Sequence, residues 1–159
     1  MCGGVAYFDE EEEVRCYFPN PYARLPVVTR HGGTKMVVWG RRRGEPGQLP
    51  LGGWARLESI RAGVWSRWQP VPVRLQLQGF MEKDIEGESH WFELTSGQWV
   101  QGLIARLGSE QRVYVVTINP EMAEAVHRAL QPDPAARFAS MEEFAAALIP
   151  FTGGTVHRL

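Results

Sequence analysis

Short apolar and β-branched runs between residue 5 and about residue 118 predict β-strands, and one of them, Val71–Leu77, alternates apolar and polar residues as a half-buried strand does. The second and third predicted strands are joined through His31-Gly32-Gly33 and the fifth and sixth through Ser96-Gly97, so each pair is expected to form an antiparallel hairpin. Residues 54–68 are expected to hold a helix or an irregular turn. The predicted strands are residues 5–8, 25–29, 35–39, 71–77, 90–94, 99–106 and 112–118.

Beyond residue 118 the pattern becomes helical. Asn119 and Pro120 suit the cap and the first position of a helix that should end at about Leu130. A second helix is predicted over Ser140–Leu148, where a glutamate follows the first serine at capping-box spacing. Strands followed by helices predict an α+β fold. We expect mainly antiparallel sheets and two C-terminal helices in one compact domain covering residues 1–159.

Composition indicates an ordinary globular protein in the cytoplasm. The chain has 159 residues, of which 44% are hydrophobic and 22% charged, and its net charge is −1. No apolar run approaches the roughly 20 residues of a membrane helix, and the acidic N-terminus argues against a signal peptide. Two cysteines make no disulfide framework, as expected in a reducing compartment. Without a Cys-x-x-Cys, a His-x-x-x-His or a phosphate-binding glycine motif, we expect neither a metal nor a cofactor.

Positive charge is concentrated between Arg41 and Arg74, a stretch that contains seven arginines and only two glutamates. Tryptophans at positions 39, 54, 65 and 68 lie within or beside this stretch. Cations for phosphates and flat rings for bases are what a groove for single-stranded nucleic acid requires. The alternative is a solvated basic face over tryptophans of the core.

Cys2 is the strongest candidate for chemistry. Removal of Met1 would leave a thiol and a free α-amine on one residue, with pKa values of about 8.5 and about 7.7–8.0. Both groups are then partly nucleophilic near neutral pH. Together they can close a thiazolidine ring on an aldehyde, or act as nucleophile and base in acyl transfer. Alternatively, Met1 is retained and Cys2 is an ordinary residue.

Two further ionisable residues are candidates for proton transfer. Glu82 follows the apolar segment Gly79-Phe80-Met81, which could raise its pKa into the range of a general acid. It could equally be a surface carboxylate paired with Lys83. His127 lies near the end of the first predicted C-terminal helix, where a histidine also interacts favourably with the helix dipole.

Six segments taken in order resemble the SOS-response-associated peptidase (SRAP) domain over roughly residues 1–130. Members of that family form thiazolidine links from an N-terminal cysteine to abasic sites in single-stranded DNA, and a peptidase activity that removes their own leading residue has been proposed. The resemblance therefore implies a domain of that fold with single-stranded DNA as partner. The segments are Met1-Cys2-Gly3, Val38-Trp39-Gly40, Ala55-Arg56-Leu57-Glu58-Ser59, Gly79-Phe80-Met81-Glu82, Val115-Val116-Thr117 and His127.

The same resemblance implies roles for individual residues. Cys2 would be the nucleophile, Glu82 would assist proton transfer, and His127 would promote formation and reversal of the Schiff base. Arg56 would meet the DNA backbone, and Trp39 would shape the cleft. Together with the arginine-rich stretch, the candidate DNA-binding residues are Trp39, Arg41, Arg42, Arg43, Trp54 and Arg56.

The chain departs from the family pattern at several positions. Gly4 stands where the family has an arginine. Trp54 stands where the family has an asparagine that hydrogen-bonds the crosslinked cysteine. The sequence after His127 also differs, so His90 or His157 could take its role. These departures motivate an alternative, a non-catalytic module of the same fold that binds DNA or protein. A third hypothesis is an N-terminal-nucleophile amidohydrolase, because glutamine amidotransferases also begin with Met-Cys-Gly.

Overall fold

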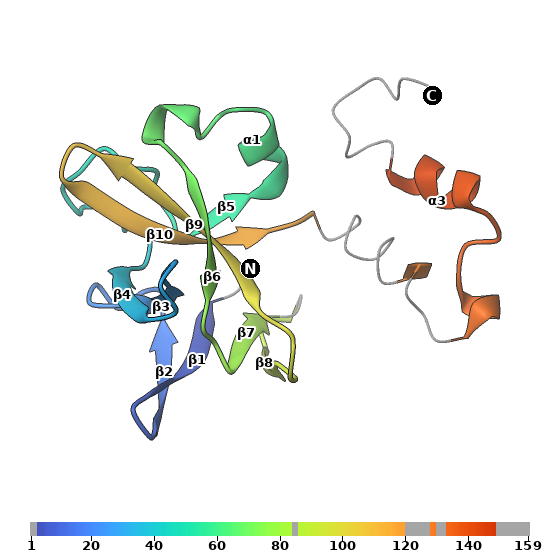
Figure 1. Cartoon of the computed structure of the whole chain (residues 1–159), viewed down its shortest axis with the longest axis horizontal. Coiled ribbons are helices and arrows are strands. Elements are labelled where there is room, and N and C mark those ends of the chain that lie inside the picture. Colours follow the sequence, from blue (N-terminus) through green and yellow to red (C-terminus); the bar gives the residue numbers. More distant parts are fainter. Residues whose placement is uncertain (1–2, 84–85, 120–127, 130–132, 149–159) are drawn as a thin grey trace. The chain divides into compact units, whose positions relative to one another are not determined.

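The computed structural model describes residues 3–83, 86–119, 128–129 and 133–148 (Figure 1). The chain divides into two compact units, one of Met1–Ala55 with Trp65–Val116 and one of Arg56–Val64 with Thr117–Leu159. The predicted α+β fold with mainly antiparallel sheets is confirmed. That residues 1–159 form a single SRAP-like domain stays a prediction.

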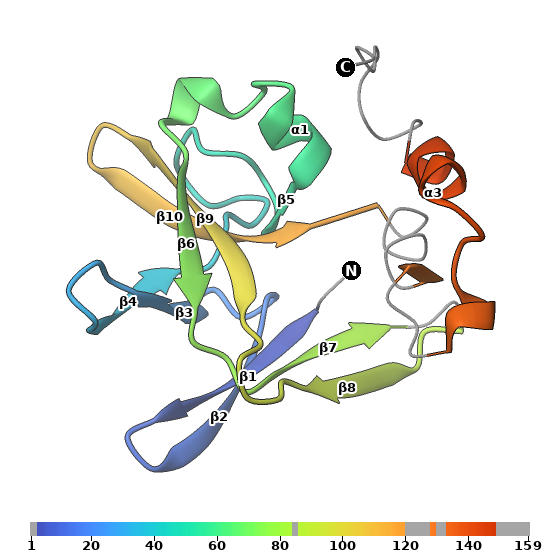
Figure 2. The same ribbon diagram turned by 45° about the vertical axis from the view of Figure 1, so that its right-hand side comes forward.

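The first unit contains a four-stranded antiparallel sheet in the order β2-β1-β7-β8 (Figure 2). The predicted first strand is therefore confirmed, and it pairs on both sides. Its neighbour β2 was not predicted, because half of the residues in its sequence Glu-Glu-Val-Arg-Cys-Tyr are charged. The strands of this sheet are β1 (Gly4–Asp9), β2 (Glu12–Tyr17), β7 (Gly79–Lys83) and β8 (Ser89–Glu93).

A six-stranded sheet has the order β4-β3-β6-β9-β10-β5. Its β3–β4 hairpin confirms the pairing predicted around His31-Gly32-Gly33. The predicted helical region after β5 contains the short helix α1 (Leu57–Arg61) and the 3-10 turn η1 (Ser66–Trp68). The strands are β3 (Arg24–Val28), β4 (Thr34–Val38), β5 (Trp54–Arg56), β6 (Val71–Leu75), β9 (Val100–Leu107) and β10 (Glu110–Thr117).

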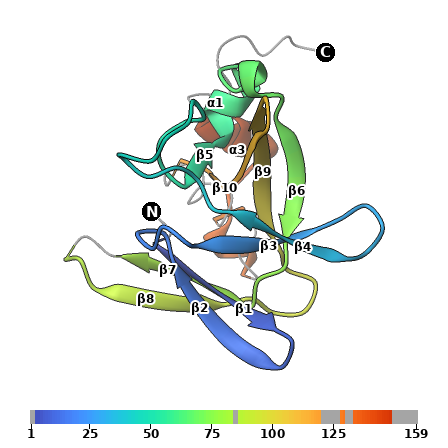
Figure 3. The ribbon, with the colours of Figure 1, turned by 90° about the vertical axis from the view of Figure 1, so that its left-hand side faces the viewer.

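Residues of both sheets form one hydrophobic core, and Figure 3 shows the ribbon of the two sheets. Val5 from β1, Leu25 from β3 and Val113 from β10 have no exposed surface. Each such side chain stabilises the fold by roughly 1.5–3 kcal/mol relative to an exposed one. The alternation predicted over 71–77 is confirmed in β6, whereas β1, β9 and β10 bury consecutive residues.

The predicted hairpin around Ser96-Gly97 is wrong, although both of its strands exist. β8 pairs with β7, whereas β9 pairs with β6 and β10 in the other sheet. A turn in which the Gln98 N–H donates to the Thr95 carbonyl (3.0 Å) carries the chain from one sheet to the other. In this arrangement β9 has a strand partner on each side, and Ile104 is buried between Val71 of β6 and Val113 of β10.

The described part of the second unit includes α1, the 3-10 turn η2 (Pro134–Ala136) and α3 (Met141–Leu148). The predicted cap of the last helix is confirmed, because the Glu143 N–H donates to Ser140 Oγ (3.1 Å). The Glu143 carboxylate in turn accepts from the backbone N–H of Ala139 (2.8 Å). Most of the helix predicted over 119–130 lies outside the described residues. Within that range, residues 128 and 129 are described and are helical.

Candidate functional site

Gly3, the first described residue, is held through both of its backbone polar groups. Its N–H donates to the carbonyl of Met81 on β7 (2.9 Å), and its carbonyl accepts from the N–H of Phe18 (3.1 Å). The first bond ties the start of β1 to β7, and the second ties it to the residue that follows β2. Cys2, the predicted nucleophile, is bonded covalently to Gly3 but lies outside the described residues.

Glu82, a predicted proton-transfer residue, lies on β7 next to this anchored end. It follows Met81 directly and is half-buried. The strand register places it opposite His90 on β8, and such opposite residues share a face with Cβ atoms about 5 Å apart. The structure thus brings Glu82 together with one of the alternative histidines, whereas His127 and His157 fall outside the described ranges.

The register between β7 and β8 depends on close packing at Gly79. A Cβ atom there would lie 2.7 Å from the backbone carbonyl oxygen of Phe92, so a larger residue would push the strands apart. One residue further on, the rings of Phe80 and Phe92 stack with centroids 5.3 Å apart and an interplanar angle of 21°. Together these contacts fix Glu82 opposite His90.

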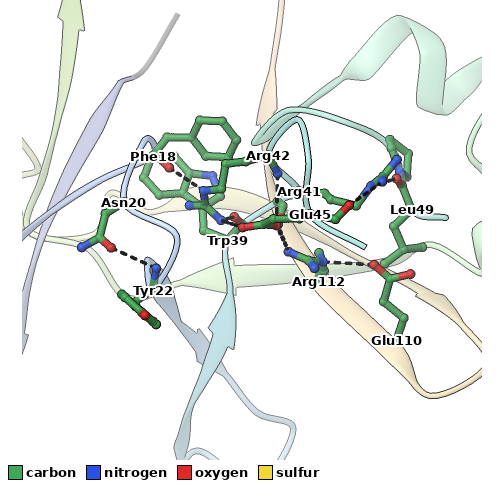
Figure 4. Close-up of polar contacts among 12 residues, drawn as sticks. Phe18, Asn20, Tyr22, Trp39, Arg41, Arg42, Glu45, Leu49, Glu110 and Arg112 are labelled. Atoms are coloured by element: carbon green, nitrogen blue, oxygen red, sulfur yellow. Dashed lines mark hydrogen bonds and ion pairs between the residues drawn. The ribbon is translucent and has the colours of Figure 1, made fainter. Parts of the chain in front are cut away.

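Arg42 was predicted to bind DNA, but its side chain instead donates hydrogen bonds within the protein and anchors the loop that follows β4 (Figure 4). Its Nε donates to the carbonyl of Phe18 (2.8 Å), and its Nη1 donates to the carbonyl of Trp39 (2.8 Å). The guanidinium also stacks over the Phe18 ring at 4.4 Å. Burial lowers the pKa of Arg42, and only 12% of its side chain is exposed.

Two further arginines hold the same loop: Arg41, which is part of it, and Arg112 of β10. Arg41 Nε donates to the carbonyl of Leu49 (2.6 Å) and its Nη1 donates to the carbonyl of Glu45 (3.2 Å). Arg112 of β10 donates through Nη1 to the carbonyl of Gly40 and to the Glu45 carboxylate, both at 2.7 Å. The last contact joins residues 67 positions apart, so no local sequence pattern could have indicated it.

The candidate DNA-binding arginines therefore fall into two groups, and the prediction is revised accordingly. Arg41 and Arg42 donate to backbone carbonyls, so their guanidinium groups are committed to the fold. Arg43 and Arg56 are exposed and stay candidates for phosphate contacts. Arg56 belongs to the second unit, where its carbonyl accepts a hydrogen bond from the Ser59 hydroxyl (2.7 Å).

Glu45→Gln is expected to destabilise the protein by about 1 kcal/mol, because it removes the charge that pairs with Arg112 at a site only partly exposed to water. Burial opposes ionisation of Glu45, but hydrogen bonds from the Arg42 backbone N–H and from Arg112 outweigh it and lower the carboxyl pKa below its ordinary value. Urea unfolding of both proteins at neutral pH measures the loss.

The pH dependence of this contribution follows from the sign of the shift. A carboxyl whose pKa is lower in the folded state stabilises fully above its unfolded pKa, and the stabilisation is lost as pH falls through the folded value. The difference between wild type and Glu45→Gln should therefore shrink below about pH 4. Glu12→Gln, on the exposed β1–β2 hairpin, is the control and should change stability by less than about 0.5 kcal/mol. An equal effect of both substitutions would contradict the assigned role of Glu45.

The two tryptophans of the predicted DNA groove lie in an aromatic cluster with Phe18. Trp39 is 0% exposed, and its indole N–H donates to the carbonyl of Gly53 (2.9 Å). Trp54 is half-buried, with its ring centroid 4.7 Å from that of Phe18 and 6.1 Å from that of Trp39. Its buried indole N–H has no acceptor among the described residues. The assignment of Trp39 is revised to a core role, since it offers no ring face to a ligand.

Cys16, the second cysteine, lacks the features of a reactive thiol. Its side chain is buried, and this burial raises the thiol pKa, which keeps it protonated and unreactive. Within the described residues, no group of three or more His, Cys, Asp or Glu side chains could hold a metal ion. None of the helices in these ranges combines the length and apolar character needed to cross a membrane.

Comparisons with known proteins do not identify a family. No protein-family model, curated protein or solved structure matches this chain. The resemblance to the SRAP domain therefore depends on the motifs in the sequence.

Proposed function

We propose that this chain, after removal of Met1, covalently captures abasic sites in single-stranded DNA through Cys2. The proposal begins from the resemblance to the SRAP family. One structural observation supports it: Gly3, the residue bonded to Cys2, is hydrogen-bonded to Met81 (2.9 Å), the immediate neighbour of Glu82. A nucleophile attached at this end of β1 would lie close to the strand that carries a half-buried carboxylate.

The proposed reaction requires no oxidant and releases one molecule of water. The α-amine of Cys2 adds to the aldehyde carbon of the open abasic sugar, and loss of the hydroxyl group as water gives an imine. The thiol sulfur then adds to the imine carbon while the thiol proton moves to nitrogen, which closes the thiazolidine ring. Glu82 donates a proton to the departing hydroxyl and recovers one afterwards. His90, the strand partner of Glu82, exchanges protons with it in this proposal, which the register of β7 with β8 supports.

The direct test combines mass spectrometry with a crosslinking assay. The intact mass first establishes whether Met1 has been removed. The processed protein is then incubated with a single strand carrying one abasic site, and with the same strand carrying a normal nucleotide as control. We expect an SDS-resistant adduct with the first strand alone. A protein with a verified N-terminal cysteine that yields no adduct would refute the proposal.

Glu82→Gln is expected to slow adduct formation by about 10²-fold, because glutamine cannot donate the proton that the leaving hydroxyl requires. The measurement is the rate at which SDS-resistant adduct accumulates at neutral pH. Glu13→Gln is the matched control, since Glu13 is an exposed carboxylate on β2, opposite Phe8, and its side chain lies on the other face of the sheet from Glu82. Equal rates for both variants would exclude Glu82 from the reaction.

A second candidate function is a non-catalytic module that binds DNA. It is favoured by Trp54, which stands where the family has an asparagine and packs against Phe18 and Trp39. An indole N–H can donate a hydrogen bond but cannot accept one. This function predicts DNA binding that weakens with salt and is unaffected by Cys2→Ala.

A further inference from the structure

A hollow of about 530 Å³ opens along β8 and the turn that leads to β9. Most of the side chains that line it are aromatic or aliphatic. Its rim also carries one carboxylate, that of Glu93. The lining residues are Phe80, Phe92, Glu93, Leu94, Gly97, Gln98, Trp99 and Val100. We refer to this feature as the β8 groove.

Two aromatic rings in the β8 groove are unusually accessible. Phe92 is 48% exposed and Trp99 is 46% exposed. The Phe92 ring stacks on that of Phe80, with centroids 5.3 Å apart. The guanidinium of Arg74 lies over the Trp99 ring, 4.8 Å from its centroid. The groove thus presents flat rings held in place by neighbours, with a cation at one end.

The β8 groove begins beside the pair formed by Glu82 and His90. Phe80 lies two residues before Glu82, and Phe92 lies two residues after His90. Because side chains two apart on a strand share a face, all four lie on the same face of β7 and β8. A strand of DNA that reacted at the Glu82 end would therefore have its next nucleotides over Phe92 and, further along, Trp99.

We propose that the β8 groove binds the unpaired bases next to the captured abasic site by stacking them on Phe92 and Trp99. This inference rests on the function proposed above. Aromatic rings stack on any base, so such a groove needs no particular sequence. The Glu93 carboxylate at the rim repels phosphates, whereas Arg74 attracts them. The bases therefore lie in the groove, and the phosphate contact falls on Arg74.

The test measures affinity for a fluorescently labelled oligothymidylate over a range of salt concentrations. Phe92→Ala and Trp99→Ala should each weaken binding about tenfold, with no change in salt dependence because neither residue is charged. Arg74→Gln should instead reduce the slope of log K against log salt concentration by about 0.7, the value for one contact to a single strand. Phe8→Ala is the control, since Phe8 is 53% exposed but alternates to the opposite face of the same sheet.

The outcomes separate this inference from the proposed function. If Phe92→Ala and Trp99→Ala bind like Phe8→Ala, the β8 groove is not the binding site, and adduct formation by the wild type still supports capture. If these variants bind weakly but the wild type forms no adduct, stacking is supported and capture is not. A wild type that binds no DNA at low salt overturns both. If Phe92→Ala or Trp99→Ala binds DNA like Phe8→Ala and also dissociates a wild-type dimer in sedimentation, the β8 groove joins two copies of the chain instead.

Discussion

Cys2→Ala is expected to abolish the SDS-resistant adduct between the processed protein and abasic single-stranded DNA. Alanine keeps the α-amine, so an imine can still form, but no sulfur is present to close the ring on it. An open imine is hydrolysed back to the aldehyde and does not survive denaturation. The loss should therefore be complete on a denaturing gel, whereas borohydride, which reduces the imine to a stable amine, should restore a crosslinked band.

Cys16→Ala provides the matched control, because it removes the only other thiol of the chain. That thiol is buried and its pKa is raised, so the substitution should leave the rate of adduct formation unchanged. An adduct that survives denaturation with Cys2→Ala, without borohydride, would show that another residue is the nucleophile. Loss of the adduct with Cys16→Ala in a folded protein would point to the same conclusion.

Trp39→Ala is expected to lower the free energy of unfolding by about 4 kcal/mol, the middle of the range for a large aromatic residue removed from a core. Trp39 has no exposed surface and packs edge-on against Phe18, with ring centroids 5.4 Å apart. In the wild type the Trp39 indole N–H donates to the carbonyl of Gly53 (2.9 Å), and the substitution removes this donor. Urea unfolding followed by circular dichroism measures the change.

Trp99→Ala distinguishes a core role from a general effect of losing an indole. Because Trp99 is 46% exposed, its removal creates no closed cavity and should cost well under half as much as Trp39→Ala. Similar losses for the two substitutions would contradict the core assignment of Trp39. If Trp39→Ala is too unstable to purify, Trp39→Phe keeps most of the ring and should give a smaller but measurable loss.

Strands were predictable where one face is apolar, and pairing was harder to predict. β3 and β4 are adjacent in sequence and joined by a glycine turn, so local signals were sufficient. β2 was missed because half of its residues are charged and its inward face has only Val14, partly buried, and Cys16, buried. β8 and β9 were wrongly paired because the turn at Ser96-Gly97 has the residues of a hairpin but joins two different sheets.

The candidate site was predictable by residue type and only in part by position. Glu82 and His90 were both considered, yet their alignment depends on the register of β7 with β8, which Gly79 permits and the Phe80–Phe92 stack reinforces. Local sequence could not distinguish His90 from the other histidines, because every histidine has similar chemistry until its neighbours are known. The same reasoning applies to Arg42, whose carbonyl partner at Phe18 is 24 residues away.

The sequence by itself determined where most of the strands lie, the N-terminal cap of the last helix and the presence of a cysteine at position 2. These are local properties, since they depend on residues a few positions apart. Only the tertiary structure decided that Arg41 and Arg42 hold a loop, that Trp39 belongs to the core, and that Glu82 faces His90. Each of these depends on contacts between distant segments, where burial decides whether a cation or a ring meets solvent or another part of the chain.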